Sequence, residues 1–119
     1  MSNDIRQLYL RWINELWSGS VRAGDLVADT FVGHWPDRRV TGPTELQKTI
    51  DETRTMFDSI TFTVEEGPFV DGDIVVGRWR GRGRTSDGPA EFVGHDILRT
   101  SGAEFVEYWA VSAPASPAT

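Results

Sequence analysis

The 119-residue sequence contains no cysteine. This absence excludes disulfides, thiolate nucleophiles and thiolate metal sites. Only two histidines are present, and neither lies in an HxH or HExxH motif, so we predict no metal site. The GxSxG motif of serine hydrolases is also missing. Carboxylates and histidines are therefore the remaining candidates for proton chemistry.

Positive charge is scarce. The 12 lysines and arginines are outnumbered by 18 aspartates and glutamates, which gives a formal net charge of −6. Nucleic acids and anionic membranes both attract basic surfaces, so we expect neither as a partner. The sequence has no apolar run of transmembrane length, and its first four residues lack the charged-then-apolar pattern of a signal peptide. We therefore expect a cytoplasmic protein.

Aromatic residues are plentiful. Five Trp and six Phe accompany a hydrophobic fraction of 39%, which is typical of a globular chain. This is more than a minimal core needs, so the aromatic residues indicate a lined cavity or an apolar partner surface. The length suits one domain, which we assign to residues 1–112. Residues 113–119 are short of apolar side chains, and we predict a disordered tail there.

The predicted elements begin with helices. Apolar residues recur at spacings of three and four from Ile5 to Trp17, which predicts an amphipathic helix. We expect a short second helix around residues 25–29 and a brief strand over Phe31–Trp35. Gly42 and Pro43 then begin a helix that runs to about Met56, because proline is favoured in the first turn.

A run of strands follows, separated by turn signals such as Asp71–Gly72. We predict strands from about residue 60 to 70, from 74 to 84, from 90 to 99 and from 104 to 112. Helices followed by antiparallel strands predict the α+β class. Gly77, Gly81 and Gly83 suit a strongly bent sheet, which would wrap over the helices and enclose a pocket.

Asp96 is the most informative single residue. It lies in the middle of the predicted strand 90–99, in the same alternation as Phe92 and Leu98, so we expect it to face the interior. An unpaired buried carboxylate is costly, so the group either takes up a proton or finds partners. Two interpretations stay open: Asp96 is an acid–base catalyst, or it only accepts static hydrogen bonds.

The alternation of side chains along the predicted strands also indicates which residues lie on the outer face of the sheet. Arg78, Arg80, Arg82 and Arg84 share one face of their strand, away from Trp79. We interpret this arginine stripe as a solvated face paired with carboxylates such as Glu65, Glu91 or Glu104, in preference to an anion site. Both faces of the last strand, 104–112, are rather apolar, which predicts a homodimer.

The two histidines complete the candidate groups. His34 lies beside Trp35 at the end of a predicted strand, where pocket mouths often form, and imidazole titrates near neutral pH. His95 has the opposite alternation to Asp96, so we expect it to point away from the interior. A structural or solvent-exposed role remains the alternative for each of them.

Three segments together resemble a known family. They are residues 31–46, with FVGHWP and GPTEL; residues 71–79, with DGDIVVGRW; and residues 94–109, with GHDILR and GAEFVEYW. From about Ile5 to Val111 the sequence resembles the SnoaL-like polyketide cyclases, a branch of the nuclear transport factor 2-like superfamily. The resemblance implies a cone-shaped α+β barrel in which helices pack on a curved, mostly antiparallel mixed sheet. It also implies a dimer, a deep apolar pocket and no cofactor.

The resemblance also implies residue roles. An aspartate in the Gly-x-Asp-Ile-x-Arg strand of such cyclases acts as acid and base in an intramolecular aldol closure, and Asp96 occupies that place. A histidine before the early proline faces the same pocket, and His34 occupies that place. In the related ketosteroid isomerases Asp96 would match an oxyanion-stabilising acid. Their first-helix tyrosine is replaced here by Trp12, with Tyr9 one turn away.

We therefore expect a cofactor-free cyclase or isomerase that acts on a small apolar carbonyl compound of the polyketide type. Asp96 and His34 are the predicted catalytic residues. The predicted cavity-shaping residues are Tyr9, Trp12, Phe31, Trp35, Trp79 and Trp109. The alternative is a non-catalytic binder of a small apolar ligand, or a dimeric interaction module. A cavity of roughly 300 Å³ or more that reaches Asp96 would favour chemistry, and a filled core with Asp96 sealed by backbone donors would favour the module.

Overall fold

A computed structural model of the chain describes residues 2–115. Its elements, in chain order, are α1 (Ser2–Arg11), a π-helical turn (Trp12–Leu16), a 3-10 turn (Ala23–Asp25), β1 (Val27–Trp35), β2 (Arg38–Thr41), α2 (Gly42–Thr55), β3 (Ser59–Asp71), β4 (Ile74–Thr85), β5 (Gly88–Ser101) and β6 (Glu104–Ala115). No helix within this part of the chain is long and apolar enough to cross a membrane.

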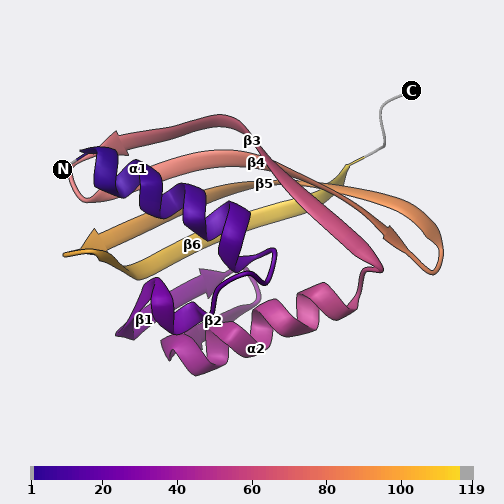
Figure 1. The fold of residues 1–119 in the computed structure, drawn as a ribbon, viewed down its shortest axis with the longest axis horizontal. Coiled ribbons are helices and arrows are strands. Elements are labelled where there is room, and N and C mark those ends of the chain that lie inside the picture. Colours follow the sequence, from indigo (N-terminus) through magenta and orange to yellow (C-terminus); the bar gives the residue numbers. More distant parts are fainter. Residues whose placement is uncertain (1, 116–119) are drawn as a thin grey trace.

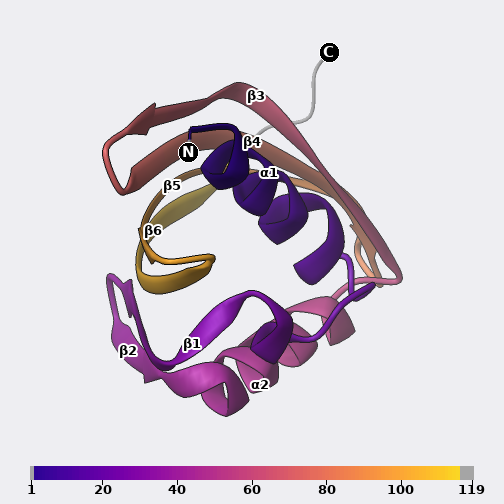
Figure 2. The ribbon, with the colours of Figure 1, turned by 60° about the vertical axis from the view of Figure 1, so that its left-hand side comes forward.

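One six-stranded sheet forms the body of the molecule. Its strand order is β2-β1-β6-β5-β4-β3, and every neighbouring pair is antiparallel except β1 and β6, which are parallel. The sheet is not closed into a barrel. It curves around α1, while α2 lies along β1 and β2 at the other end (Figures 1 and 2). The α+β class and the cone-like arrangement of helices on a curved mixed sheet are as predicted.

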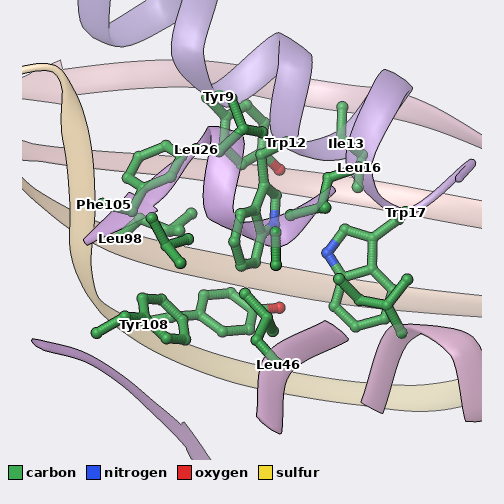
Figure 3. Close-up of a cluster of buried hydrophobic side chains, with 14 of the residues drawn as sticks. Tyr9, Trp12, Ile13, Leu16, Trp17, Leu26, Leu46, Leu98, Phe105 and Tyr108 are labelled. Atoms are coloured by element: carbon green, nitrogen blue, oxygen red, sulfur yellow. The ribbon is translucent and has the colours of Figure 1, made fainter. Parts of the chain in front are cut away.

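The core fills the space between the concave face of the sheet and the helices. The stripe predicted from the helical spacing is buried along α1 and the π-helical turn that continues it, and Tyr9, Trp12 and Leu16 are fully buried. Figure 3 shows these side chains pointing toward partners from the sheet and from α2, among them Leu46, Leu98, Phe105 and Tyr108. The helical segment ends at Gly19, whose positive φ of 90° suits glycine.

Two boundaries differ from the sequence prediction. The short second helix expected at residues 25–29 is a 3-10 turn at Ala23–Asp25, because Val27 already pairs with Phe105 and begins β1. At the other end β6 continues to Ala115, and its residues 113–115 pair with residues 91–93 of β5. Sheet pairing thus orders three residues that we expected in a disordered tail. The remaining four, 116–119, lie outside the described residues.

The arginine stripe faces outward and is paired with carboxylates, as interpreted from the sequence. Arg78 and Arg80 both contact Glu65, at N–O distances of 3.1 and 2.8 Å. Arg80 and Arg82 both contact Glu91, at 3.2 and 3.7 Å. These contacts neutralise much of the charge of the arginine stripe. Trp79 and the strand glycines lie on the opposite, concave face of β4.

Candidate active site

Asp96 lies in the middle of β5 and points into the concave side of the sheet. Its side chain is only 1% exposed, and Leu98, two residues further along the same face, is fully buried. The inward orientation is therefore as the alternation predicts. A carboxylate at this depth requires partners, because it has lost nearly all contact with solvent.

Three side-chain donors surround the Asp96 carboxylate, and each comes from a different element. The Tyr108 hydroxyl of β6 donates to Oδ1 at 2.7 Å, and the Trp79 indole N–H of β4 donates to the same oxygen at 3.1 Å. The Tyr9 hydroxyl of α1 donates to Oδ2 at 3.1 Å. A carboxylate offers about four acceptor positions, so Oδ2 retains room for one further donor or for a proton.

Two glycines make room for these donors. In the β4–β5 ladder Gly77 pairs with Asp96, and Gly94 pairs with Trp79. A Cβ atom on Gly77 would lie 2.5 Å from the Tyr9 hydroxyl oxygen, and a Cβ atom on Gly94 would overlap the Trp79 indole. The absence of side chains at these positions thus lets both rings reach the carboxylate. We predicted that Gly77 relieves a sheet bend, and its close neighbour in the structure is Tyr9.

The surroundings of Asp96 act on its pKa in opposite directions. Burial raises the pKa, the hydrogen bonds from Tyr108, Trp79 and Tyr9 lower it in that order, and the net pKa is raised to about 6. The Trp12 indole N–H lowers it least, and its buried nitrogen forms no hydrogen bond of normal geometry with residues 2–115. Burial and the neighbouring carboxylate raise the pKa of both tyrosines far above neutral pH, so they remain donors.

A cavity of about 220 Å³ reaches this carboxylate. It is smaller than the roughly 300 Å³ that we set as favouring chemistry. Its lining is mostly aromatic and aliphatic, and the residues in it that carry a polar group are Asp96, Tyr108, Thr53, Ser112 and the tryptophans Trp17, Trp35 and Trp79. The full lining is Ile13, Trp17, Trp35, Thr53, Met56, Phe57, Ile60, Phe62, Trp79, Phe92, Asp96, Tyr108, Ala110 and Ser112. The donors to Asp96 are side chains rather than backbone groups, so the site does not match the sealed alternative either.

The predicted cavity-shaping residues separate into three groups. Trp35 and Trp79 line the cavity. Tyr9, Trp12 and Phe31 are fully buried in the core beside it, where Tyr9 still bonds Asp96. Trp109 lies on the outer face of the sheet, stacked on His34 at a ring distance of 5.4 Å.

His34 is not brought to Asp96. Its Nε2 lies 2.8 Å from the Glu107 carboxylate on the outer face of the sheet, where Arg99 also contacts Glu107 at 3.6 Å. The physical reason is the pleat of β1: Phe31 and Gly33 face the core, so the residue after Gly33 must face outward. His95 points outward as predicted, and it contacts Arg78 at 2.9 Å.

Sequence reasoning missed Tyr108, which donates the shortest of the three hydrogen bonds. A register shift between Arg99 and Thr100 interrupts the β5–β6 ladder, so Phe105 and Tyr108 both end up buried although strict alternation separates them. In the structure Tyr108 pairs with the buried Leu98, and partners across a ladder share a face, so Tyr108 lies on the concave side. Within residues 2–115 no group of three histidine or carboxylate side chains could hold a metal ion.

Solved structures with similar folds include several proteins that are described as polyketide cyclases. A protein described as a SnoaL-like polyketide cyclase from Jannaschia has a TM-score of 0.82 at 17% identity, over 92% of this chain and 85% of that one. A protein described as a polyketide cyclase from Bacillus cereus has a TM-score of 0.81 at 22% identity, over 92% and 74%. These likenesses show the fold.

A third structure, from Catenulispora acidiphila, is described as having a ketosteroid isomerase-like fold and was solved with trimethylamine. It has a TM-score of 0.71 at 18% identity, over 90% of this chain and 83% of that one. No curated protein matches the sequence. The SnoaL-like domain family matches residues 9–108, which include Asp96 and all three of its donors. The chain therefore belongs to the SnoaL-like domain family.

Proposed function

We propose that the protein is a cofactor-free cyclase or isomerase in which Asp96 transfers a proton at the carbon next to a carbonyl group. The observation that carries this proposal is a buried carboxylate with a pKa near 6 at the wall of a largely apolar cavity. A general base is most effective when its pKa lies near the working pH. At pH 7 a pKa of about 6 leaves most of the Asp96 population ionised and ready to accept a proton.

The proposed reaction begins with proton abstraction. Asp96 takes a proton from the carbon α to a carbonyl, the electron pair of the broken C–H bond forms an enolate, and the carboxylate becomes a neutral acid. In a cyclase the enolate carbon then attacks a second carbonyl of the same molecule and forms a C–C bond. The new alkoxide takes the proton back from Asp96. No electron acceptor is needed, because the sequence of steps is redox-neutral.

The hydrogen-bond donors suit this movement of charge. Tyr108 and Trp79 both line the cavity and both donate to Oδ1 of Asp96. When Asp96 becomes neutral, these donors lose their charged acceptor and can turn toward the enolate oxygen. Donors positioned in an apolar, water-poor site stabilise a developing oxyanion strongly, because little solvent screens the interaction.

A second function, ligand binding without turnover, is favoured by a different observation. Asp96 is almost fully buried and already accepts three side-chain hydrogen bonds, which is also how a static structural carboxylate is held. In this alternative the cavity binds a small apolar molecule, and Asp96 only fixes the positions of Tyr9 and Tyr108.

Deuterium exchange separates the two functions without knowledge of the natural substrate. We expect the protein to accelerate exchange from D2O into the carbon next to the carbonyl of 1-indanone, followed by NMR. Asp96→Asn should lower this catalysed rate by about 10²–10⁴-fold, because general acid–base catalysis typically contributes that much. Binding of 1-indanone, measured by calorimetry, should survive because the amide keeps the shape of the side chain.

Glu107→Gln is the matched control, because it neutralises a carboxylate on the outer face of the sheet beside His34. It should leave the exchange rate unchanged. Full exchange activity in Asp96→Asn would refute the proposed mechanism. Binding of 1-indanone by both proteins with no catalysed exchange in either would establish the ligand-binding alternative.

We also propose that the outer face of the sheet packs against a second copy of the chain. Four apolar residues of neighbouring strands pair directly with one another across the sheet, and we call them the outer apolar row: Phe69, Val76, Ile97 and Trp109. Phe69 is 59% exposed and Ile97 is 40% exposed, and Val111 beside them is 63% exposed. Large apolar side chains gathered in this way mark an interaction surface.

The charges around the outer apolar row favour a second copy as the occupant. Arg78 and Arg80 are paired with Glu65 on one side of the row, and Arg99 contacts both Glu107 and Asp73 on the other. The face is thus locally balanced although the chain carries a net charge of −6. Two identical copies would not repel each other there, whereas a strongly basic or acidic partner would find no complementary field.

A further inference from the structure

Among the described residues of the cavity lining, Ser112 carries the one hydroxyl group that neither bonds Asp96 nor bonds the backbone of its own helix. Tyr108 and Trp79 both donate to Asp96, and the Thr53 hydroxyl donates to the backbone carbonyl of Thr49 at 2.9 Å. Ser112 lies on β6 and is exposed at the cavity. Its hydroxyl can donate one hydrogen bond and accept two.

The register of the sheet fixes the separation between Ser112 and Asp96. Asp96 pairs with Ala110, and Ser112 is two residues further along the same face of β6, opposite Gly94. Diagonal neighbours on adjacent antiparallel strands lie about 7–8 Å apart. The cavity therefore has two polar levels, one at the carboxylate and one at Ser112, with apolar side chains between and around them.

The size of the cavity limits what can occupy both levels. An apolar cavity of about 150 Å³ holds benzene, which has six non-hydrogen atoms. At the same density a cavity of about 220 Å³ holds roughly nine such atoms, and because the cavity is partly open a ligand with a few more can extend beyond it. This corresponds to one ring with a few substituents or to a small fused bicycle, and a linear tricyclic skeleton exceeds it.

The charge of the lining limits the ligand further. Among residues 2–115, the cavity lining contains no lysine, arginine or histidine, and its one carboxylate is Asp96. A carboxylate or phosphate on the ligand would therefore lose its hydration without gaining a counter-ion, and it would be repelled by ionised Asp96. The lining suits a ligand without negative charge.

From these observations we infer that Ser112 selects the substrate, which is a neutral mono- or bicyclic carbonyl compound with a hydroxyl or second carbonyl group about 7–8 Å from the first. Ser112 bonds that second group while the first carbonyl lies at Asp96 and Tyr108. This inference rests on the proposed function for the orientation of the carbonyl. The selectivity itself is a property of binding and can be measured without turnover.

Calorimetry with four ketones tests the inference. The probes are 1-indanone, 5-hydroxy-1-indanone, indan-1-one-5-carboxylate and the tricyclic fluorenone. We expect the 5-hydroxy compound to bind roughly 2- to 10-fold more tightly than 1-indanone, which is the typical range for one neutral hydrogen bond. The carboxylate and fluorenone should both bind at least about 10-fold more weakly than 1-indanone, because of the missing counter-ion and the limited volume.

Ser112→Ala should remove the preference for the 5-hydroxy compound and leave the affinity for 1-indanone unchanged. Thr53→Val is the matched control, because it removes another hydroxyl of the same lining that is already bonded to its helix. Thr53→Val should keep the preference. A preference that survives in Ser112→Ala, or equal affinities of the wild-type protein for 1-indanone and its carboxylate, would overturn the inference.

The same probes separate this inference from the proposed function. Hydroxyl preference with no catalysed deuterium exchange in any probe supports the role of Ser112 and refutes proton transfer by Asp96. Catalysed exchange that depends on Asp96, with no hydroxyl preference in the wild-type protein, supports the proposed function and refutes the role of Ser112.

Discussion

At the scale of single residues, Asp96 combines two opposing demands. Burial disfavours its charge, and three donors stabilise that charge. Neither effect alone would suit a proton carrier at neutral pH: burial alone would keep the group protonated, and the donors alone would make it too weak a base. Together they place the pKa at about 6, and the tyrosines stay protonated because the same burial raises their own pKa values.

The raised pKa predicts a pH dependence of stability. The native Asp96 holds its proton up to about pH 6, whereas the unfolded side chain releases it near 3.8. The native state thus binds more protons between these values, and the stability that Asp96 contributes is fully present below pH 3.8 and is lost as the pH rises through 6. We expect this loss to be about 3 kcal/mol in the free energy of unfolding.

Urea unfolding of the wild-type protein and of Asp96→Asn, compared from pH 3.5 to 7.5, measures this contribution. Asparagine does not titrate, so the difference between the two proteins isolates Asp96 from the other carboxylates. The stability of the wild-type protein relative to the variant should fall across this range. A difference that is constant or that rises with pH would contradict the raised pKa.

The sequence was sufficient to place Asp96 inside and His95 outside, because both follow from the alternation of one strand. The prediction that His34 faces the pocket comes from the family resemblance and is wrong, because the alternation of Phe31, Gly33 and His34 along β1 turns the histidine outward. Tyr108 was missed for a different reason. The irregular register between β5 and β6 depends on how the whole sheet packs, and the local pattern does not reveal it.

At the scale of elements, glycines in the β4–β5 ladder provide the space that the side chains around Asp96 need. Asp96 on β5 pairs with Gly77 on β4, and Trp79 on β4 pairs with Gly94 on β5. Each large side chain therefore lies opposite a position without a side chain, which we call a gap. Tyr9 occupies one gap from α1, and the Trp79 indole lies over the other. Because Gly77 and Gly94 have no side chains, α1, β4 and β5 can pack closely around the carboxylate.

Filling one of these gaps should disturb the site specifically. Gly94→Ala places a methyl group where the Trp79 indole lies, and we expect it to lower stability by about 1–3 kcal/mol, as overpacking usually does. It should also displace the indole N–H from Asp96, raise the pKa of that carboxyl and shift the pH profile of deuterium exchange upward.

The control for this change is Gly24→Ala, because a Cβ atom on Gly24 meets no atom within 4 Å. Both variants are compared by urea unfolding and by the pH dependence of exchange into 1-indanone. If Gly94→Ala behaves like Gly24→Ala in both measurements, the indole does not depend on the gap.

At the scale of the whole molecule, the two faces of the sheet have separate tasks in our proposals. The concave face holds the cavity and Asp96, and the convex face carries the outer apolar row. The order of elements that produces these faces was predictable, since the period of apolar residues changes from helical to alternating near residue 60. The cavity volume was not, because it is the small space left after Trp12, Phe31 and other large side chains fill the core.

The proposed dimer predicts a change of mass on mutation of the convex face. Ile97→Glu places a charge in the outer apolar row between Val76 and Trp109, where a partner's apolar surface would desolvate it. We expect light scattering after size-exclusion chromatography to give twice the mass of the chain for the wild-type protein and the single mass for the variant.

Met56→Glu is the control, because Met56 is 62% exposed but lies at the cavity rather than on the convex face. It should keep the doubled mass. A wild-type protein that is monomeric at micromolar concentration would refute the dimer. A wild-type dimer that persists in Ile97→Glu would place the interface elsewhere.

The glycines opposite Asp96 and Trp79 also constrain how this protein can evolve. Gly77 leaves room for the Tyr9 ring, so a descendant that loses Asp96 loses one of the reasons to keep Gly77 bare. Once a methyl group appears there, restoring the aspartate alone cannot bring Tyr9 back to it. Loss of Asp96 would therefore be hard to reverse, because regaining the site would require two substitutions together, at position 96 and at position 77.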